Sequence, residues 1–350
     1  MIVSNPLIIH HEKLGAELDA GNRPLSFTNT VEEYWAVKKS SGMADISSLG
    51  RLIVTGKDRV SFLNGLLTND ATKLREGEGQ HSALLNNKAR VTADLYLYGQ
   101  PNSLLVDTGN ALASKVKQDL DRFVITEDVQ ILDATHDLVQ ITIQGSQSGR
   151  TIKETLGTTV DDLKPLQQKT LGPSTIVSRD RTGQGGYDII IPRDEAEAVW
   201  QGFLLKSGIS GIKPIGSRAL EILRLEAGYP KYGVDLDENT IILEAGFKDA
   251  ISFTKGCYLG QEVVARATHI GRVNKQLVQL EVETNQAPSS HSKLRKDTVE
   301  AGFVTSAAFS PGIGRVLALA YANRDYAKDG TRLSVEGSEI PNAATVTRVL

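Results

Sequence analysis

The character of the sequence changes near Val273, where the signals for helices end. From there to the C-terminus, short runs rich in alternating apolar residues are separated by turn residues: NKQLVQLEVE, EAGFVTSAAF, RVLALAYA, RLSVEG and ATVTRVL. A period of two is typical of β-strands, and several short strands in succession are typical of barrels and sandwiches. The sequence therefore predicts an all-β barrel over residues 273–350.

The preceding 272 residues mix strands with helices. Helices are expected at 30–41, 58–67, 110–122 and 216–228, the last ending at Gly228, and a hairpin is expected over 81–99 around an Asn-Asn-Lys turn. Thr30 and Glu33 have the spacing of a capping box at the first helix. The strands and helices do not alternate regularly, which favours an α+β fold over a doubly wound sheet. GxGxxG, Walker A, HExxH and GxSxG motifs are absent from the sequence.

Length and charge limit the class of protein. At 350 residues the chain is longer than one hydrophobic core usually serves, so two or three packed units are expected. A formal net charge of −3 argues against a nucleic-acid or membrane-surface binder. The N-terminus has no signal-peptide pattern, and no run of about 18 apolar residues occurs. A cytoplasmic protein is expected.

The only cysteine, Cys257, raises the question of a working thiol. Lys255 precedes it by two residues, so in an extended segment both side chains would point to one face, where an ammonium favours the thiolate. The alternative is that an isolated cysteine fills a small apolar gap in the core. One cysteine cannot hold a structural zinc, and the six histidines show no metal-ligand spacing, so no metal site is expected.

The residues around Cys257 form the motif KGCYLGQE. Gly256 and Gly260 permit unusual backbone angles or the close approach of a ligand. Gln261 and Glu262 would begin a helix, which places Cys257 just before a helix N-terminus. Such neighbours favour a functional cysteine over a buried filler.

This octapeptide, which includes Tyr258, resembles the signature of the YgfZ family of folate-binding proteins, which includes an iron–sulfur assembly factor. The surrounding stretch 224–277 follows that family's pattern nearly without gaps. RLEAGYPKYGVDLDE also looks like the glycine-cleavage T-protein, an aminomethyltransferase of the same superfamily. SSGMADISSLGRLIVTGKDRVSFLNGLLTND and GFVTSAAFSPGIGRVLALAYA follow the pattern shared by both families, so the resemblance runs from about Pro6 to the C-terminus.

The resemblance implies an α+β fold of three domains, arranged as a cloverleaf around a central channel that binds tetrahydrofolate or a one-carbon-substituted folate. The expected boundaries are 1–50 with about 135–215 for the first α+β domain, 51–134 with about 216–272 for the second, and 273–350 for the barrel. The first two domains would therefore be discontinuous in sequence.

The resemblance also implies particular site residues. T-proteins carry a catalytic and folate-orienting aspartate in a Gly-Gly-x-x-Asp-Asp-Leu motif, which corresponds here to KARVTADL, with Ala93 in place of one acidic residue and Asp94 retained. Asp94 is thus a candidate to bind folate nitrogens or to move a proton. The alternative is a solvated aspartate at a strand end. Together with Cys257 and Lys255, Asp94 completes the set of candidate catalytic residues.

A glutamate that clamps the pterin ring in T-proteins corresponds here to Gln184, in SRDRTGQGGYDI. A carboxylate only accepts, whereas an amide offers one acceptor and one donor group, so the pairing with a pterin would change. Gln184 is otherwise a hairpin-turn residue. Arg218 and Arg224 match positions near the folate in this superfamily, and Arg224 could instead be a surface salt-bridge partner.

Three functions remain open from the sequence. The first is a tetrahydrofolate-binding protein that supports iron–sulfur cluster assembly or repair through the thiol of Cys257, with an iron–sulfur carrier or client protein as partner. The second is an aminomethyltransferase of the glycine cleavage system. The third is a folate-binding scaffold without turnover. Ala93, Gln184 and the cysteine motif favour the first, so we predict it, with no nucleic-acid or membrane partner.

Overall fold

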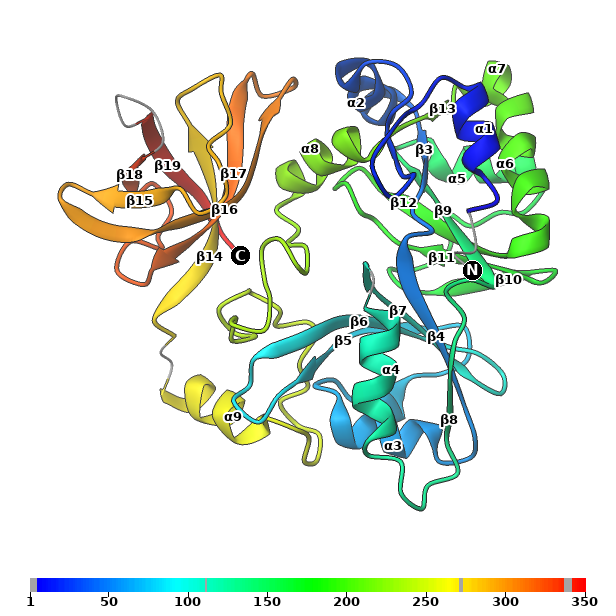
Figure 1. Ribbon diagram of the computed structural model, residues 1–350, viewed down its shortest axis with the longest axis horizontal. Coiled ribbons are helices and arrows are strands. Elements are labelled where there is room, and N and C mark those ends of the chain that lie inside the picture. The colour runs from blue at the N-terminus through cyan, green and yellow to red at the C-terminus, as the bar shows by residue number, and fades with distance from the viewer. Residues whose placement is uncertain (1–4, 111, 271–272, 337–341) are drawn as a thin grey trace. The chain divides into compact units, whose positions relative to one another are not determined.

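The computed structural model describes residues 5–110, 112–270, 273–336 and 342–350 (Figure 1). The chain forms two compact units, each built from several stretches of sequence. The first unit contains Met1–Phe62, Ala71–Gln80 and Leu95–Leu223, and the second contains Leu63–Asp70, His81–Asp94 and Arg224–Leu350. The division into three domains and their expected boundaries stay predictions.

A six-stranded sheet forms the centre of the first unit, in the order β10-β11-β12-β9-β3-β13. Its strands are β3 (Gly42–Asp45), β9 (Leu138–Gln144), β10 (Gln168–Leu171), β11 (Ser174–Ser178), β12 (Gly186–Pro192) and β13 (Lys213–Pro214). All pairs are antiparallel except β13 with β3. Helices α5 (Ser148–Leu156) and α6 (Ala196–Leu205) bury Ile152, Trp200 and Phe203 against the isoleucines of β9 and β12. Because these apolar side chains leave water together, they form the main core of this unit.

A five-stranded sheet follows the order β5-β6-β7-β4-β8. Its strands are β4 (Leu49–Thr55), β5 (Gly79–Leu85), β6 (Val91–Gly99), β7 (Leu104–Asn110) and β8 (Gln130–Asp133). Helix α4 (Ala113–Asp121) contacts β4 and β8 and has Val116 and Leu120 buried. The predicted hairpin over 81–99 is present as β5 and β6, and its tip, His81–Asp94, belongs to the second unit.

The N-terminal part of the first unit contains α1 (Ile8–Lys13), β1 (Glu17–Leu18), β2 (Pro24–Ser26) and α2 (Thr30–Lys39). The cap of α2 differs from the prediction, since Asn29 is the N-cap and its side chain accepts from the amide of Glu32 at 2.8 Å. Glu33 is buried and accepts instead from the amides of Phe27 and Gly216. The capping box was wrong because the glutamate satisfies buried amides outside the helix.

The C-terminal barrel is closed, in the order β14-β17-β16-β15-β18-β19, and appears in Figure 1 as the yellow, orange and red strands. The strands are β14 (Lys275–Val282), β15 (Lys293–Lys296), β16 (Val299–Ser310), β17 (Arg315–Asn323), β18 (Arg332–Val335) and β19 (Asn342–Val349). Valine and alanine side chains such as Val278, Ala320 and Val346 fill its interior. The predicted fold class, α+β with an all-β barrel at the C-terminus, is confirmed.

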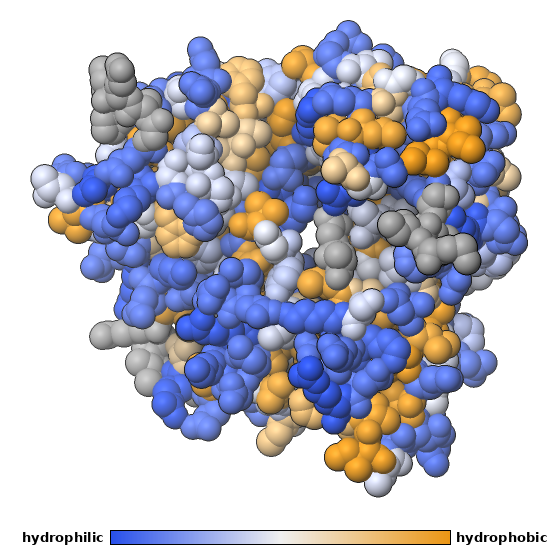
Figure 2. All heavy atoms as spheres, viewed as in Figure 1, coloured by the Kyte–Doolittle hydropathy of each residue, from blue (hydrophilic) through white to orange (hydrophobic). Residues whose placement is uncertain are grey.

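The connecting helices are α3 (Arg59–Leu66), α7 (Ser207–Ser210), α8 (Ser217–Ala227), α9 (Gln261–Ile270) and the 3-10 turns at Ala71–Lys73 and Arg193–Glu195. Within the described residues, every helix is too short or too polar to cross a membrane. Figure 2 shows hydrophilic residues over most of the visible face, with hydrophobic residues in separate patches between them. Such a mixture is ordinary for a protein surface in contact with water.

Candidate functional site

Asp94 lies on β6, at the end of the hairpin tip that belongs to the second unit. The turn between β5 and β6 is closed by a hydrogen bond from the amide of Asn86 to the carbonyl of Arg90 at 3.0 Å. The Asn86 side chain also accepts from the amides of Lys88 and Arg90, and Ala89 takes a positive φ of 56°. Asparagine supports such a turn because its side chain bonds the backbone two residues on. The hairpin therefore brings the start of β5 next to Asp94.

His81, on β5, connects Asp94 to a second carboxylate. Its Nε2 lies 2.6 Å from Oδ1 of Asp94, and its Nδ1 lies 2.8 Å from Oδ2 of Asp249. The imidazole is only 5% exposed, while the carboxylates of Asp94 and Asp249 are 16% and 73% exposed. The aromatic ring of Phe247 packs edge-on against it, 4.9 Å between centroids. The imidazole is thus buried while both of its carboxylate partners reach solvent.

The segment Leu67–Asn69 holds the two sides of this cluster together. The side-chain amide of Asn69 donates to the carbonyl of His81 at 2.8 Å and to the carbonyl of Asp249 at 3.0 Å. The hydroxyl of Thr68 donates to the carbonyl of Ala250 at 2.6 Å and accepts from the amide of Ala83 at 2.8 Å. Because these bonds join separate segments, and those to His81, Ala83 and Ala250 are buried or half-buried, they fix the position of β5 relative to the loop that carries Asp249.

The two carboxylates change the titration of His81. Burial alone lowers the pKa of an imidazole, but the charge of Asp94 and the hydrogen bonds to both aspartates outweigh it and raise the pKa of His81 to about 9. Conversely, burial raises the pKa of Asp249, but the hydrogen bond from His81 outweighs it and lowers that pKa. At neutral pH the imidazole is therefore an imidazolium between acidic neighbours.

Ala93 is completely buried and Asp94 is partly exposed, in line with the alternation along β6. Successive side chains of a strand point to opposite faces of the sheet. The position at which the T-protein pattern carries its other aspartate therefore faces the interior of this chain, away from Asp94. An apolar residue suits that face, and Asp94 is the carboxylate of this pair that remains.

Lys255 of the octapeptide is bound to the backbone at the end of α3. Its Nζ donates to the carbonyls of Asn64, Leu67 and Asn69 at 2.5, 2.7 and 2.9 Å. Helix C-termini leave carbonyls without intrahelical partners, and a lysine is a common donor to them. Burial lowers the pKa of Lys255 to about 8, which still leaves an ammonium at neutral pH. Through Asn69, Lys255 is connected to the cluster of His81.

Cys257 is a free thiol at an exposed position, so it is not a filler of a buried apolar gap. The segment from Lys255 to Cys257 is irregular rather than a strand, and the three ammonium hydrogen bonds of Lys255 run to carbonyls. An effect of Lys255 on the thiol, and a catalytic role for Cys257, stay predictions.

The other residues of the octapeptide have identifiable packing roles. Tyr258 is buried in the core beside the β5–β6 hairpin. Gly260 has a φ of 82°, and a Cβ there would lie 2.7 Å from the carbonyl oxygen of Asn86. Gln261 begins α9, as predicted, and Glu262 pairs with Arg266 on its exposed surface at 2.7 Å. Gly256, by contrast, has open space at its Cα.

Arg224 forms a buried ion pair within the second unit. Its Nη1 lies 2.7 Å from Oδ2 of Asp235 and 2.5 Å from the carbonyl oxygen of Tyr229, and its Nη2 donates to Ser306 at 3.1 Å. The other oxygen of Asp235 accepts from the hydroxyls of Thr305 and Ser306, both at 2.5 Å. These contacts tie α8 to β16 of the barrel, while the predicted folate contact of Arg224 stays a prediction.

Gln184 and Arg218 lie in the first unit. Gln184 occupies the turn between β11 and β12, flanked by Gly183 and Gly185 at positive φ, and its side chain donates to the carbonyl of Gly183 at 3.1 Å. Arg218 lies on α8 and forms a two-pronged ion pair with Glu17 at the surface. The predicted folate contacts of Gln184 and Arg218 stay predictions.

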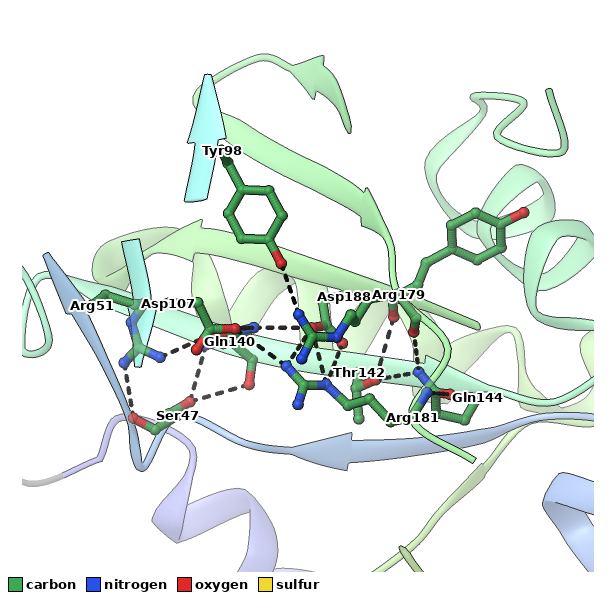
Figure 3. A network of polar contacts seen from close by, with 11 residues as sticks. Ser47, Arg51, Tyr98, Asp107, Gln140, Thr142, Gln144, Arg179, Arg181 and Asp188 are labelled. Atoms are coloured by element: carbon green, nitrogen blue, oxygen red, sulfur yellow. Dashed lines mark hydrogen bonds and ion pairs between the residues drawn. The ribbon is translucent and has the colours of Figure 1, made fainter. Parts of the chain in front are cut away.

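A buried polar network in the first unit was not anticipated from the sequence (Figure 3). Arg181 lies 2.6 Å from Asp188 and 3.3 Å from Asp107, and the side-chain nitrogen of Gln140 donates to both of these aspartates. Arg51, fully buried, donates to the oxygen of Gln140 at 3.2 Å. Burial raises the pKa of Asp107, although the charge of Arg181 opposes the rise. The network joins strands β4, β7, β9 and β12.

Arg179 extends this network toward two tyrosines. Its guanidinium carbon lies 3.1 Å from the centre of the Tyr96 ring, and its Nη1 donates to the hydroxyl of Tyr98 at 3.2 Å. Figure 3 shows Arg179 and Arg181 reaching the same polar cluster from the loop after β11. The sequence contains one signal for this network, which is an aspartate inside each of two apolar strands, at 107 and 188. A carboxylate in such a strand is buried and therefore needs a cation beside it.

Two family models match nearly the whole chain. Residues 10–255 match the GCVT N-terminal domain, and residues 275–349 match the glycine cleavage T-protein C-terminal barrel domain. The chain belongs to the glycine cleavage T-protein family. Among its relatives are aminomethyltransferases from Thermotoga petrophila, 31% identical over 98% of this chain and 96% of the relative, and from Desulfitobacterium hafniense, 30% identical over 94% and 92%.

A solved structure supports the same fold. The crystal structure of glycine cleavage system aminomethyltransferase T from Bartonella henselae has a TM-score of 0.91 and 24% identity, covering 98% of this chain and 96% of that chain. The two family models and the aminomethyltransferase relatives confirm the membership of the T-protein superfamily that the sequence predicted. The narrower assignment to its YgfZ-type branch is not supported by these relatives.

The predicted function in iron–sulfur cluster assembly or repair is wrong, because full-length relatives in the T-protein family are named aminomethyltransferases. The prediction gave most weight to eight residues around Cys257 and to departures at Ala93 and Gln184, whereas the similarity to the T-protein family extends over almost the entire chain. The predicted partner, an iron–sulfur carrier or client protein, depended on that function and is not supported either.

Among the predicted site residues, the second unit contains Asp94, Arg224, Lys255 and Cys257. Hydrogen bonds through Asn69 and His81 connect Lys255 to Asp94. His81 and Asp249 were not predicted, because no histidine in the sequence has the spacing of a metal ligand and neither residue belongs to a motif. The predicted hairpin carried a signal for His81, since it places the residues near 81 beside those near 94.

Proposed function

We propose that this chain is an aminomethyltransferase that transfers a one-carbon unit to tetrahydrofolate. The observation that carries the proposal is the similarity to relatives of that name along more than nine-tenths of the chain. The retained Asp94, held in place by His81, supports it from the structure. This function was the second of the three that the sequence left open.

Tetrahydrofolate would serve as the acceptor and supply two nitrogens, each with one N–H. The methylene carbon leaves the lipoyl sulfur and its own nitrogen, and forms bonds to both folate nitrogens. The two N–H protons are taken up by the departing groups, which leave as a dihydrolipoyl thiol and ammonia. The chain must therefore bind N–H donors in one orientation and help protons to move between nitrogen and the departing groups.

The residues around Asp94 fit this requirement. A carboxylate accepts N–H groups and can carry a proton, and Asp94 keeps part of its side chain at the surface while His81 holds Oδ1. We therefore assign to Asp94 the orientation of the folate N–H groups and the proton movement at this point. Gln184 would pair with a pterin through one acceptor and one donor group, unlike the family's glutamate. Folate contacts of Arg218 and Arg224 remain further predictions.

A reconstituted glycine-cleavage assay with an aminomethyl-lipoyl carrier and tetrahydrofolate tests the proposal. Asp94→Asn keeps the shape of the side chain and removes its charge and basicity, so transfer should fall about 100-fold or more. Asp329→Asn, the same change at an exposed barrel loop, is the control and should keep full activity.

Two other results would count against the proposal. Wild-type protein that binds tetrahydrofolate without transferring a one-carbon unit would leave a folate-binding scaffold, the third function. Transfer that survives Asp94→Asn unchanged would remove Asp94 from the reaction. Cys257→Ala distinguishes the thiol's role, because the proposed transfer does not use it and should proceed at the wild-type rate.

A further inference from the structure

We infer that His81 is a positioning residue that holds the carboxylate of Asp94 in one orientation for the folate, with Asp249 fixing the imidazole from its other nitrogen. This inference rests on the proposed function in one respect, the assignment of folate to Asp94. The residues that make up the device lie in one unit and come from β5, β6 and the loop before Ala250.

The contacts of the imidazole determine how many protons it carries. Both ring nitrogens face carboxylate oxygens, at 2.6 and 2.8 Å. A neutral imidazole has one N–H, so with two ionised carboxylates one of its contacts would set a lone pair against a carboxylate oxygen. Two N–H donors satisfy both contacts. The geometry therefore requires an imidazolium, unless one of the carboxylates carries the proton.

The imidazole of His81 is held in one orientation. It is nearly enclosed, packs against Phe247, and its backbone carbonyl is tied to that of Asp249 through the side chain of Asn69. The carboxylates of Asp94, on β6, and of Asp249, in the loop, both raise its pKa. Held from both nitrogens, the ring cannot turn without breaking a charge-assisted hydrogen bond.

The imidazole in turn orients the carboxylate of Asp94. Oδ1 is engaged by the imidazolium, which fixes the plane of the carboxylate and leaves Oδ2 for an N–H of the ligand. A carboxylate without this contact would have to be ordered when the ligand binds, which costs binding free energy. Ala93, the residue before Asp94, faces the interior and cannot orient it. The orientation of Asp94 therefore depends on His81, which is close to it in space.

The experiment compares His81→Gln, His81→Leu and Asp249→Asn with the wild type. The readouts are the dissociation constant for tetrahydrofolate and the pH profile of aminomethyl transfer. His81→Leu removes the donor and should weaken tetrahydrofolate binding about tenfold or more. His81→Gln keeps a neutral donor and should lose less, and its profile should lack the decline that the wild type shows as pH rises toward about 9.

Asp249→Asn is the sharpest variant, because it changes only the partner of the imidazole's Nδ1 and leaves both His81 and Asp94 in place. Removing this negative charge makes the imidazolium easier to deprotonate, so the alkaline decline should move to lower pH by about one unit. Asp329→Asn makes the same change of charge on an exposed loop and should leave the profile in place. A purely structural role for Asp249 would lower activity equally at every pH.

The outcomes separate the inference from the proposed function. Suppose that the wild type transfers the one-carbon unit. If His81→Leu then binds tetrahydrofolate with an unchanged dissociation constant, or if the pH profile of Asp249→Asn does not move, the inference is wrong and the transferase function stands. Wild type that binds tetrahydrofolate without transfer, but with the expected losses in the His81 variants, overturns the transferase and supports the positioning role. Wild type that does neither overturns both. If His81→Leu does not fold, His81→Gln and Asp249→Asn decide.

Discussion

Arg224 and Asp235 form an ion pair inside the second unit, with 2.7 Å between Nη1 and Oδ2. The carboxylate is completely enclosed and the guanidinium is 11% exposed. Because the remaining oxygen of Asp235 is bonded to the hydroxyls of Thr305 and Ser306, the pair is satisfied on its barrel side as well. A buried pair of this kind costs most when one partner is removed, since the other charge stays buried and uncompensated.

Asp235→Ala should therefore lower the free energy of unfolding by about 3–5 kcal/mol. Urea unfolding followed by circular dichroism measures the loss. Glu262→Ala removes the carboxylate of an exposed pair with Arg266 on α9 and should leave the midpoint nearly unchanged, because exposed pairs contribute little. Equal losses in the two variants would contradict the structural role of the Arg224 pair.

The two glycines of the octapeptide should respond differently to alanine. Gly260→Ala places a Cβ 2.7 Å from the carbonyl oxygen of Asn86 and forces alanine to a φ of 82°, so it should destabilise the protein by about 2 kcal/mol or more. Gly256→Ala meets open space and should be tolerated. Thermal unfolding of both variants decides. A destabilised Gly256→Ala variant would show that Gly256 has a structural role of its own.

Lys255 and Cys257 should likewise separate in a stability measurement. Lys255→Met removes the donor from three half-buried carbonyls at the end of α3 and should cost about 1–3 kcal/mol. Cys257→Ala, two residues away, changes an exposed side chain and should leave the unfolding curve in place. If Lys255→Met were as stable as the wild type, the lysine would be available for chemistry rather than needed for the fold.

Local patterns made much of the fold predictable. The barrel strands, the β5–β6 hairpin and helix α8 follow from periodicity and turn residues, because each is determined by neighbours a few positions apart. The cap of α2 was missed because Glu33 satisfies amides that include the one of Gly216, far away in sequence. Short-range patterns contain no information on such partners.

The candidate site was predictable only in part, for the same reason. Asp94 was found through its motif, whereas His81 and Asp249 are connected to it only by the folding of three distant segments. Lys255 was predicted to act on the neighbouring Cys257, but its ammonium is bound to carbonyls of another segment. The closeness of Lys255 and Cys257 in the sequence suggested that they act together, whereas in the structure Lys255 binds carbonyls at the end of α3.

The charge of His81 gives the fold a dependence on pH. A histidine whose pKa is higher in the folded state than its usual 6.5 stabilises the fold fully below that usual value. The contribution declines as pH rises through the folded-state pKa of about 9 and is absent above it. The hydrogen bond from His81 lowers the pKa of Asp249, which means that the ionised carboxylate is stabilised in the folded state. This contribution of Asp249 to stability is present only while its carboxylate and the imidazole are both charged.

Asp249→Asn should consequently destabilise the protein most near pH 6, where both groups of the wild type are charged, and least near pH 10, where the imidazole is neutral. The difference in the free energy of unfolding between wild type and variant, measured in urea at about pH 6, 8 and 10, should shrink steadily across this range. Asp329→Asn, with the same charge change at an exposed loop, should show no such trend. If this difference stayed constant from pH 6 to 10, Asp249 would not stabilise a charged His81. The conclusion that an imidazolium lies between the two aspartates would then be wrong.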